Sequence, residues 1–474
     1  MPSVQITGRS GDAVAVAEST INAVASELDG SLLRPEDEGY DEAVSLWNAM
    51  VAKRPALVIR PDSNRDVVRA VTFAREEGVE LSIKGGGHNI AGLSLSDGGV
   101  TLDMSGLRSV NVDTQRGLVH VAAGCTLADV DRATQAHGLA TTLGFVSLTG
   151  VAGLTVGGGF GYLTRRFGWT VDDLEEVEIV TADGTVRRAS RTENDDLFWA
   201  VRGGGGNFGV VTEFVYRLHE VGPQVTAGVI AWPAADADRV MAAFREVTDH
   251  GPRELTLALV RRNAPPAPWL PESAHGTPVV LMVACHSGDL ASAAADLEPI
   301  TSVGTPLANL IQVKDYAVQQ TLLDATMPKG MHYYWKSEFL PGLSDGLIEA
   351  YQAQFVDLKA PANQATLFHL AGALNEHAED DGAVGNREAA FACVSQSMWA
   401  PDSPAGDANR EWVRNAWQAM KPFSTGGNYV NFQTADESEE RTREAYRSNF
   451  ERLQAAKARY DPDNLFRINR NVSL

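Results

Sequence analysis

The chain has 474 residues, more than one ordinary hydrophobic core holds, so we expect two domains of roughly one to two hundred residues each. Hydrophobic residues make up 44% and charged residues 21%, which is typical of a globular protein and excludes a disordered one. The formal net charge of −21 would repel phosphate backbones and anionic lipids. We therefore expect neither nucleic acid nor membrane partners.

Targeting signals and metal motifs are also not expected. The first 20 residues lack a basic segment followed by a continuous apolar stretch, and the apolar run at 279–285 is too short to span a bilayer, so we expect a soluble cytoplasmic protein. The cysteines are Cys125, Cys285 and Cys393, an odd and widely separated set. They fit a reducing compartment better than a disulfide framework, and they lack the spacing of zinc ligands, so no metal site is predicted.

Residues 56–84 predict a strand, a helix and a second strand, in that order. The helix begins after Ser63, which resembles a capping pair with Asp66, and it stops near Gly78. The second strand runs directly into "GGGHN", which contains His88. Glycines lift the steric bar to close backbone approach, so this loop is shaped around a turn or a ligand.

The glycines of this motif open a loop and not a helix. A dinucleotide-binding Rossmann loop needs its glycines at a helix N-terminus, so that interpretation is weak here. Short strands and a capped helix beginning near Thr126 follow, and two further glycine clusters occupy 144–168 and 198–214. Three glycine-dense loops indicate a long, thin ligand held by backbone amides.

The pattern changes after residue 218. Apolar strands alternate with amphipathic helices, which predicts an α+β unit with an antiparallel sheet. The last fifty residues regain the character of the first part. We therefore predict a first domain over 1–218, a substrate-binding domain over 219–424, and a C-terminal segment over 425–474 that returns to the first domain.

Five stretches spread over nearly the whole chain resemble one known family. They are "KGGGHN", "GLTVGGGFGYLTRRFG", "DLFWAVRGGGGNFGVVTEF", "YVNF" and "YDPDNLFRINRNV". Their order and spacing resemble the berberine bridge enzyme-like flavoproteins of the vanillyl-alcohol oxidase superfamily, in particular the bacterial type. The resemblance implies an α+β fold, with a PCMH-type FAD-binding domain of two α/β subdomains and an α+β substrate domain whose antiparallel sheet is flanked by helices.

The resemblance implies FAD as cofactor, covalently attached through His88 to the flavin 8α-methyl carbon. Many relatives add a cysteinyl link to flavin C6, but Val146 stands at that position, so no cysteinyl link is expected there. Leu154 stands where relatives place a histidine. The residues assigned to FAD binding are Gly85, Gly86, Gly87, His88, Asn89, Gly92, Leu143, Gly144, Thr149, Gly150, Gly153, Gly158, Gly161, Val180 and Asn431.

Three residues are candidates for the catalytic base or substrate anchor. Glu376 matches the glutamate of the family's "GG-x-x-x-E" strand, where apolar neighbours on its face would place it in a buried cavity. Tyr429 of "YVNF" matches a tyrosine that is the base in several relatives, and strand alternation would put Asn431 on the same face. Lys336 is a lone lysine among aromatic residues in "HYYWKSEF". The sequence leaves the choice among the three open.

We expect an FAD-dependent oxidoreductase that transfers a hydride from a small alcohol, sugar or amine to flavin N5, with O2 as the expected acceptor. One alternative is a dehydrogenase that uses another acceptor, since Thr149 stands where relatives carry an aliphatic residue thought to regulate oxygen approach. A second is an NAD(P)H-dependent reductase on the same scaffold, disfavoured because such enzymes usually hold FAD without a covalent link. A third is a non-catalytic binding or resistance protein with a degenerate flavin site. The sequence leaves the substrate and the oligomeric state open.

Overall fold

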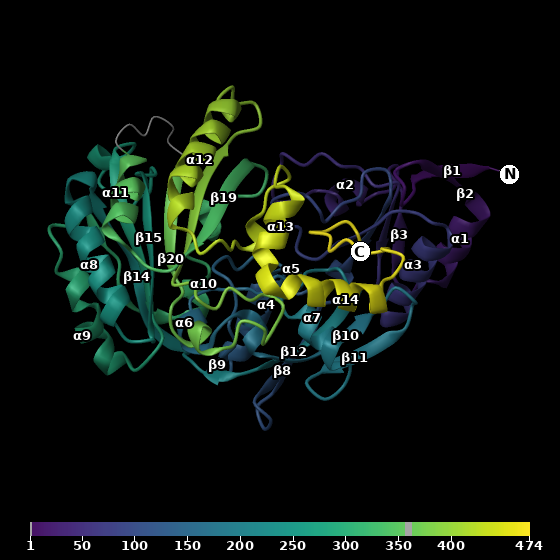
Figure 1. Cartoon of the computed structure of the whole chain (residues 1–474), viewed down its shortest axis with the longest axis horizontal. Helices are drawn as coiled ribbons and strands as arrows, with labels where there is room; N and C mark the ends of the chain where they lie inside the picture. The colour runs from purple at the N-terminus through teal and green to yellow at the C-terminus, as the bar shows by residue number, and fades with distance from the viewer. Residues whose placement is uncertain (1, 356–362) are drawn as a thin grey trace.

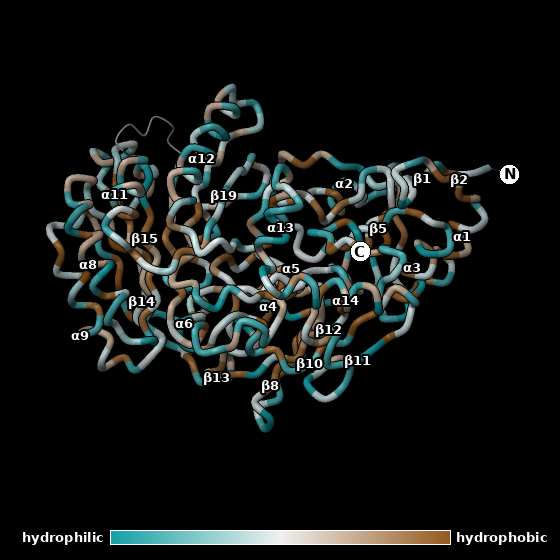
Figure 2. Tube along the Cα trace, viewed as in Figure 1, coloured by the Kyte–Doolittle hydropathy of each residue, from teal (hydrophilic) through white to brown (hydrophobic). Residues whose placement is uncertain are grey.

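The computed structural model describes residues 2–355 and 363–474, and it has the predicted α+β architecture. One domain contains both termini, and the second carries a large sheet (Figure 1). Figure 2 shows that the apolar segments follow the strands of the large sheets, while the helices carry hydrophilic turns at the surface. Burial of strand side chains against helices thus defines the layers of both domains.

The first subdomain holds a four-stranded sheet in the order β3-β4-β6-β5, in which β4, β6 and β5 run parallel. Its strands are β3 (Ser31–Leu33), β4 (Leu57–Arg60), β5 (Leu81–Lys84) and β6 (Val100–Asp103). Helix α3 (Asn64–Glu76) connects β4 to β5, and the Ser63 side chain accepts a hydrogen bond from the Asp66 amide. Gly78 has a φ of +67° after the helix. The predicted strand, helix and strand are confirmed.

The second subdomain is an antiparallel sheet in the order β11-β10-β12-β8-β7. Its strands are β7 (Val110–Asp113), β8 (Leu118–Ala122), β10 (Leu174–Val180), β11 (Val186–Ser190) and β12 (Val210–Arg217). Its helices include α4 (Leu127–Gln135), α5 (Val151–Val156) and α7 (Asp195–Val201). Thr126 and Asp129 form the capping box that starts α4, as the sequence predicts.

The second domain is built on an eight-stranded antiparallel sheet in the order β17-β14-β16-β15-β20-β21-β19, with β18 beside β14. The strands are β14 (Gln224–Pro233), β15 (Leu255–Asn263), β16 (Pro278–His286), β17 (Ala308–Asn309), β18 (Gln312–Asp315), β19 (His332–Leu340), β20 (Gln364–His369) and β21 (Phe391–Trp399). The helices on its outer side are α8 (Ala237–His250), α9 (Leu290–Thr301), α11 (Asp345–Ala353) and α12 (Gly406–Met420) (Figure 1). The opposite face of the sheet faces the first domain.

The C-terminal segment packs against the first domain, where α14 (Phe450–Tyr460) contacts α7. The segment contains a second helix before α14, because α13 (Glu439–Tyr446) ends at Arg447, whose φ is +51°. Leu453 and Phe466 belong to the same hydrophobic core as both N-terminal subdomains. The tail is therefore part of that core.

Two segments predicted as strands form 3-10 turns instead. Residues Ala373–Glu376 are one turn and Val430–Phe432 the other. In the first, the Asn375 carboxamide accepts from the Gly372 amide and donates to the carbonyls of Arg387 and Ala389. A side chain thus takes the backbone partners that a strand would have used.

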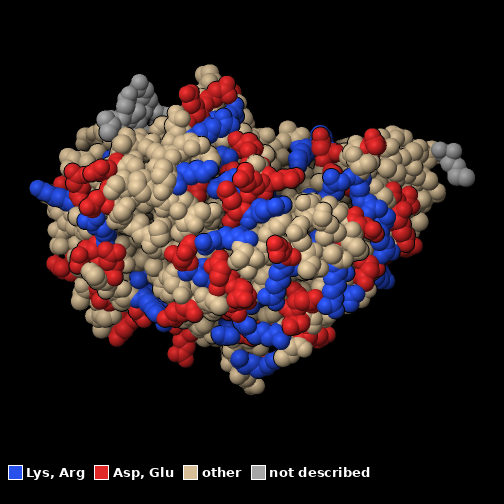
Figure 3. Space-filling view, viewed as in Figure 1, with Lys and Arg blue, Asp and Glu red and all other residues tan. Residues whose placement is uncertain are grey.

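On the face shown in Figure 3, acidic and basic side chains are interspersed over both domains. Within residues 2–355 and 363–474, no helix is long and apolar enough to cross a membrane.

The buried ion pair of α14 gives a stability prediction for the tail. Lys457 is fully buried, and its Nζ donates to Asp461 at 2.6 Å and to the carbonyls of Asn207 and Phe466. We expect Lys457→Met to lower the free energy of unfolding by about 3–5 kcal/mol, because Asp461 keeps its buried charge without the cation. The measurement is urea unfolding followed by tryptophan fluorescence.

Arg410→Met is the matched control, because Arg410 also forms an ion pair along a helix, but with the almost fully exposed Asp407. It should change the free energy of unfolding by no more than about 1 kcal/mol. If both variants lost the same free energy of unfolding, the buried pair of Lys457 and Asp461 would not stabilise the tail as assigned.

Candidate functional site

A cavity of about 330 Å³ lies where the two domains and the C-terminal segment meet. Its walls come from all three glycine clusters, from the tail and from the large sheet. The glycines that line it are Gly85, Gly86, Gly87, Gly144, Gly150, Gly153, Gly205, Gly206 and Gly209. The expectation of one shared ligand site for the three glycine clusters agrees with this arrangement.

The loop after β5 packs directly on the loop before α5. A Cβ on Gly86 would lie 2.3 Å from the Gly150 amide nitrogen, and a Cβ on Gly150 would lie 2.2 Å from the Gly86 nitrogen. Neither position tolerates a side chain, because real Cβ contacts are never so short. The two backbones therefore form one continuous wall of the cavity.

Backbone donors along this wall are unpaired. Among the described residues, the amides of 86–89 have no acceptor in the protein. Gly87 is buried, His88 and Asn89 are half-buried and Gly86 is exposed, so these free amides are open to an anionic or carbonyl-bearing ligand in the cavity. Apolar side chains that include Ile83, Phe208 and Val210 complete the wall, as a flat aromatic ring system requires. The residues present thus fit a cofactor with both phosphates and rings, such as FAD.

His88 lies in this loop with its ring stacked on Trp47 at a centroid distance of 5.4 Å. Burial lowers the pKa of His88 to about 4, and the charge of Lys329 contributes in the same direction. No hydrogen bond to its ring is present within the described part of the chain. The imidazole is therefore neutral at physiological pH, with its nitrogen lone pair free.

The positions that bear on a second covalent link also lie at the cavity. Val146 and Leu154 both line it. Cys125 does not line it, since it is buried in the core of the first domain with its Sγ 3.4 Å from the Ser109 carbonyl. Burial raises the pKa of Cys125 to about 11, which keeps this thiol protonated and unreactive.

Tyr429 lines the cavity and is 4% exposed. Its hydroxyl oxygen accepts hydrogen bonds from the Gly159 amide at 3.2 Å and from the Asn431 carboxamide at 3.0 Å. Burial raises the pKa of Tyr429 to about 12, while these two donors pull it in the opposite direction. Both donors would stabilise the phenolate form of Tyr429. Asn431 also lines the cavity, so the pair predicted from "YVNF" does meet there, in a turn and not in a strand.

The sequence predicts Lys336 as a catalytic base or substrate anchor, but its side chain lies on the face of β19 that points away from the cavity. Its Nζ lies 2.9 Å from Asp436 and 2.8 Å from Glu437. Its neighbour Trp335 lines the cavity instead. Because successive strand residues point to opposite faces, one of the two had to turn away.

The sequence predicts Glu376 as a buried base on a strand, and the prediction that it is buried on a strand is wrong. It lies in an exposed 3-10 turn, outside the cavity lining, and forms a bidentate ion pair with Arg253. Hydrogen bonding to Arg253 lowers the pKa of Glu376, the opposite of what a base working near neutrality needs.

Most of the residues predicted to bind FAD line the cavity, and a minority support it from behind. The lining includes Gly85–Asn89, Gly144, Thr149, Gly150, Gly153 and Asn431. The supporting residues outside the lining are Gly92, Leu143, Gly158, Gly161 and Val180. A Cβ on Gly161, for example, would lie 1.8 Å from the Leu143 carbonyl, so this glycine is needed for packing.

Sequence reasoning missed part of the lining. The third glycine cluster contributes Phe208 and Val210, and the tail contributes Phe466, Ile468, Asn469 and Arg470. The signal was present in "GGGGNFGVV" and "LFRINR", because both stretches combine backbone freedom or polar side chains with apolar ones. The large sheet contributes Phe368, Val394 and Gln396, for which no local motif exists.

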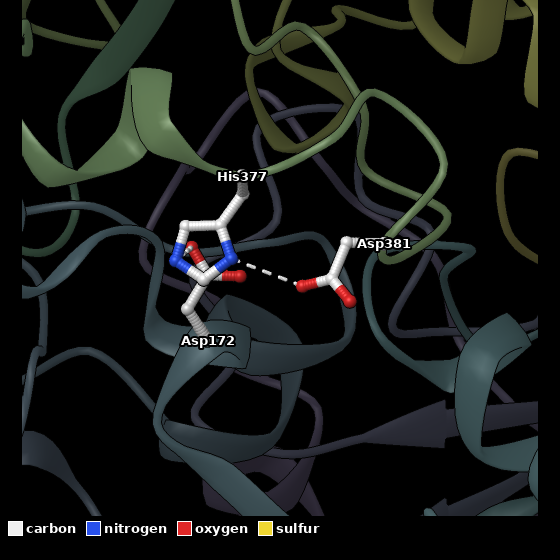
Figure 4. Close-up of side chains that lie close together, drawn as sticks. All are labelled: Asp172, His377 and Asp381. Carbon is white, nitrogen blue, oxygen red and sulfur yellow. Dashed lines mark hydrogen bonds and ion pairs between the residues drawn. The ribbon is translucent and has the colours of Figure 1, made fainter.

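A cluster of Asp172, His377 and Asp381 lies outside this cavity (Figure 4). The His377 ring bonds Asp381 at 3.0 Å. Arg387 holds both oxygens of Asp172, and Arg202 bonds Asp381 at 3.1 Å. The guanidinium groups satisfy the carboxylates, so the cluster is a structural ion network.

The chain is similar to known FAD-linked proteins. A family model described as an FAD binding domain matches residues 55–190, and one described as berberine and berberine like matches residues 428–473. The chain is 28% identical to (R)-6-hydroxynicotine oxidase of Paenarthrobacter nicotinovorans, covering 95% of this chain and 98% of that protein. It is also 28% identical to glucooligosaccharide oxidase of Sarocladium strictum, covering 94% and 93%.

One solved structure is also similar to nearly the whole chain. The structure of glucooligosaccharide oxidase from Acremonium strictum, whose FAD is described as 6-S-cysteinyl and 8α-N1-histidyl, matches with a TM-score of 0.82 and 25% identity, over 94% of this chain and 97% of that one.

The contact between the two glycine loops gives a prediction for the site. We expect Gly86→Ala to lower the free energy of unfolding by about 1–3 kcal/mol and to lower the fraction of the protein that takes up a ligand in the cavity, because the new Cβ forces the loops apart. The measurement combines thermal unfolding with absorbance spectra of the purified protein. Gly342→Ala is the control, since a Cβ there meets nothing within 4 Å, and normal stability of both variants would refute the close contact.

Proposed function

We propose that the chain, an FAD-linked oxidoreductase similar to the berberine bridge enzyme-like proteins, acts on alcohol or amine donors, that FAD is attached through His88 alone, that Tyr429 accepts the substrate proton, and that O2 takes the electrons. One observation carries the proposal. A single cavity contains a histidine whose ring has no hydrogen bond among the described residues, a row of free backbone amides and a buried tyrosine whose oxygen accepts two hydrogen bonds that would stabilise a phenolate. The choice of O2 is supported by relatives that are oxidases.

FAD, when bound, supplies the hydride acceptor, and the protein supplies orientation and a group for the proton. The amides of 86–89 and the glycines of the second and third clusters would hold the cofactor. Trp47 fixes the His88 ring by stacking, and Asn431 fixes Tyr429. These contacts keep both reactive side chains in place before a substrate enters.

Single attachment follows from the chemistry of the side chains at the two positions. His88 has a free nitrogen lone pair at neutral pH, as a nucleophile toward the cofactor needs. Val146 lines the cavity without any nucleophilic atom, and Cys125 is buried elsewhere. Nothing in the described lining offers a thiol for a second link.

Acid precipitation tests the attachment. Flavin fluorescence should stay with the pellet of the wild-type protein and should leave it in His88→Ala, whereas His137→Ala, an exposed histidine outside the cavity, should behave as wild type. The intact mass should exceed the chain by one FAD, with all three cysteines alkylated after denaturation. Flavin in the supernatant of the wild-type protein, or a thiol lost to alkylation, would refute attachment through His88 alone.

Tyr429→Phe tests the proton acceptor. Removing the hydroxyl should lower kcat by about 10²–10⁴-fold, the range for loss of a general base, while FAD stays bound. Stopped-flow reduction of the bound flavin is the measurement. Glu376→Gln is the comparison and should react as wild type, because its ion pair with Arg253 lies outside the cavity. If flavin reduction were slow in Glu376→Gln and fast in Tyr429→Phe, the base would be Glu376 and not Tyr429.

The pKa of Tyr429 sets the pH dependence. A base must be deprotonated to act, and burial raises this pKa to about 12, so the active form increases steadily as pH rises through the working range. The rate of flavin reduction should therefore rise by about tenfold per pH unit from pH 7 to pH 10. The slope should vanish in Tyr429→Phe. A flat wild-type profile would show that the phenolate is not the base.

A further inference from the structure

The substrate domain contributes a nearly apolar wall to the cavity. Its lining residues are Leu323, Met327, Trp335, Phe368, Val394 and Gln396. Five of these six are apolar, and none carries a charge. Gln396 is thus the one carboxamide that the described part of this domain presents to the cavity, and beside it stands the indole N–H of Trp335, which has no partner in the protein.

Strand alternation produces this composition. Trp335 of β19 pairs with Gln396 of β21, so the two side chains share a face of the sheet. Val394 lies two residues before Gln396 on that face. Lys336 and Glu338 of β19 point to the opposite face, where they bond acidic residues and Arg441, respectively. The charged residues of these strands are therefore kept away from the cavity.

The Gln396 carboxamide is free to bind a ligand. Within the described residues no hydrogen bond to its side chain is present. Gln364, its neighbour on β20, differs because its carbonyl accepts from Arg262 at 2.9 Å. A half-buried amide beside Trp335 offers both a donor and an acceptor to one polar group of a substrate.

This wall discriminates between classes of substrate. Each sugar hydroxyl buried against apolar side chains without a partner weakens binding by about tenfold or more, and one amide cannot satisfy several hydroxyls. An ionised group would lack a countercharge from this wall. A flat apolar ring gains from contact with Trp335 and Phe368. The two relatives named above are equally similar to this chain and act on different kinds of molecule, so identity to them does not decide the class.

We propose that the substrate is a compact, neutral molecule with an aromatic or other flat apolar body, one hydrogen-bonding group bound by Gln396, and the oxidised alcohol or amine carbon at Tyr429. Oligosaccharides are excluded. This inference rests on the proposed function, because it places the substrate in the same cavity as FAD.

The test is titration of the purified holoenzyme under anaerobic conditions, with the flavin absorption spectrum as the readout of binding and of reduction. The probes are 3-hydroxybenzyl alcohol, benzyl alcohol and cellobiose. The first should bind about tenfold more tightly than the second, which lacks the ring hydroxyl, and at least about a hundredfold more tightly than cellobiose. In Gln396→Leu the preference between the two aromatic alcohols should disappear, while the affinity for benzyl alcohol is kept.

Gln115→Leu is the control, because Gln115 lies in an exposed turn and should leave all three affinities unchanged. The inference is overturned if cellobiose binds more tightly than the aromatic alcohols, if neither aromatic alcohol perturbs the spectrum, or if Gln396→Leu keeps the preference. A protein purified without flavin would instead refute the proposed function. A flavin that is present and reduced by cellobiose alone refutes only the substrate class.

Discussion

The backbones of Gly86 and Gly150 lie so close that a Cβ on either would fall within 2.3 Å of a nitrogen of the other. This contact joins the end of the parallel sheet to the start of α5. The third glycine cluster is joined to the same unit, because the Gly205 amide donates to the Val156 carbonyl at the end of α5. Asn431 completes it, since its carboxamide donates to the carbonyls of Gly153 and Leu154. Segments from four parts of the chain thus share one wall.

The second domain is held against this wall by buried polar contacts. Asp324 accepts hydrogen bonds from the amide and the hydroxyl of Ser147 at 2.9 and 2.6 Å. Gln320 donates to Asp131 and to the carbonyl of Gly144, a residue of the cavity lining. Burial raises the pKa of Asp131 to about 7, so its carboxyl does not carry a full charge in this interface at neutral pH. The segment that supplies Leu323 and Met327 is therefore tied to the loop that it faces.

Sequence reasoning succeeded where the signal is local. Ser63 and Thr126 mark helix starts by capping bonds that involve residues three positions away, and both helices are present as predicted. It failed at Glu376, because the Asn375 side chain replaces strand partners with bonds to residues 12 and 14 positions further on. Alternation along "HYYWKSEF" shows that Trp335 and Lys336 face opposite ways, but which of them faces the cavity depends on packing against the other domain. Gln396 has no motif of its own, and only the pairing of β19 with β21 brings it to the site.

The neutrality of the substrate wall and the high pKa of Tyr429 have a common origin. A nearby cation would lower the pKa of the phenol and would also attract anionic substrates. The one lysine of β19, Lys336, is neutralised by Asp436 and Glu437 on the far face. With that charge turned away, only the Gly159 amide and Asn431 stabilise the phenolate, and burial dominates its pKa. Under the proposed function, the orientation of one strand residue therefore couples the proton-accepting step to the choice of a neutral substrate.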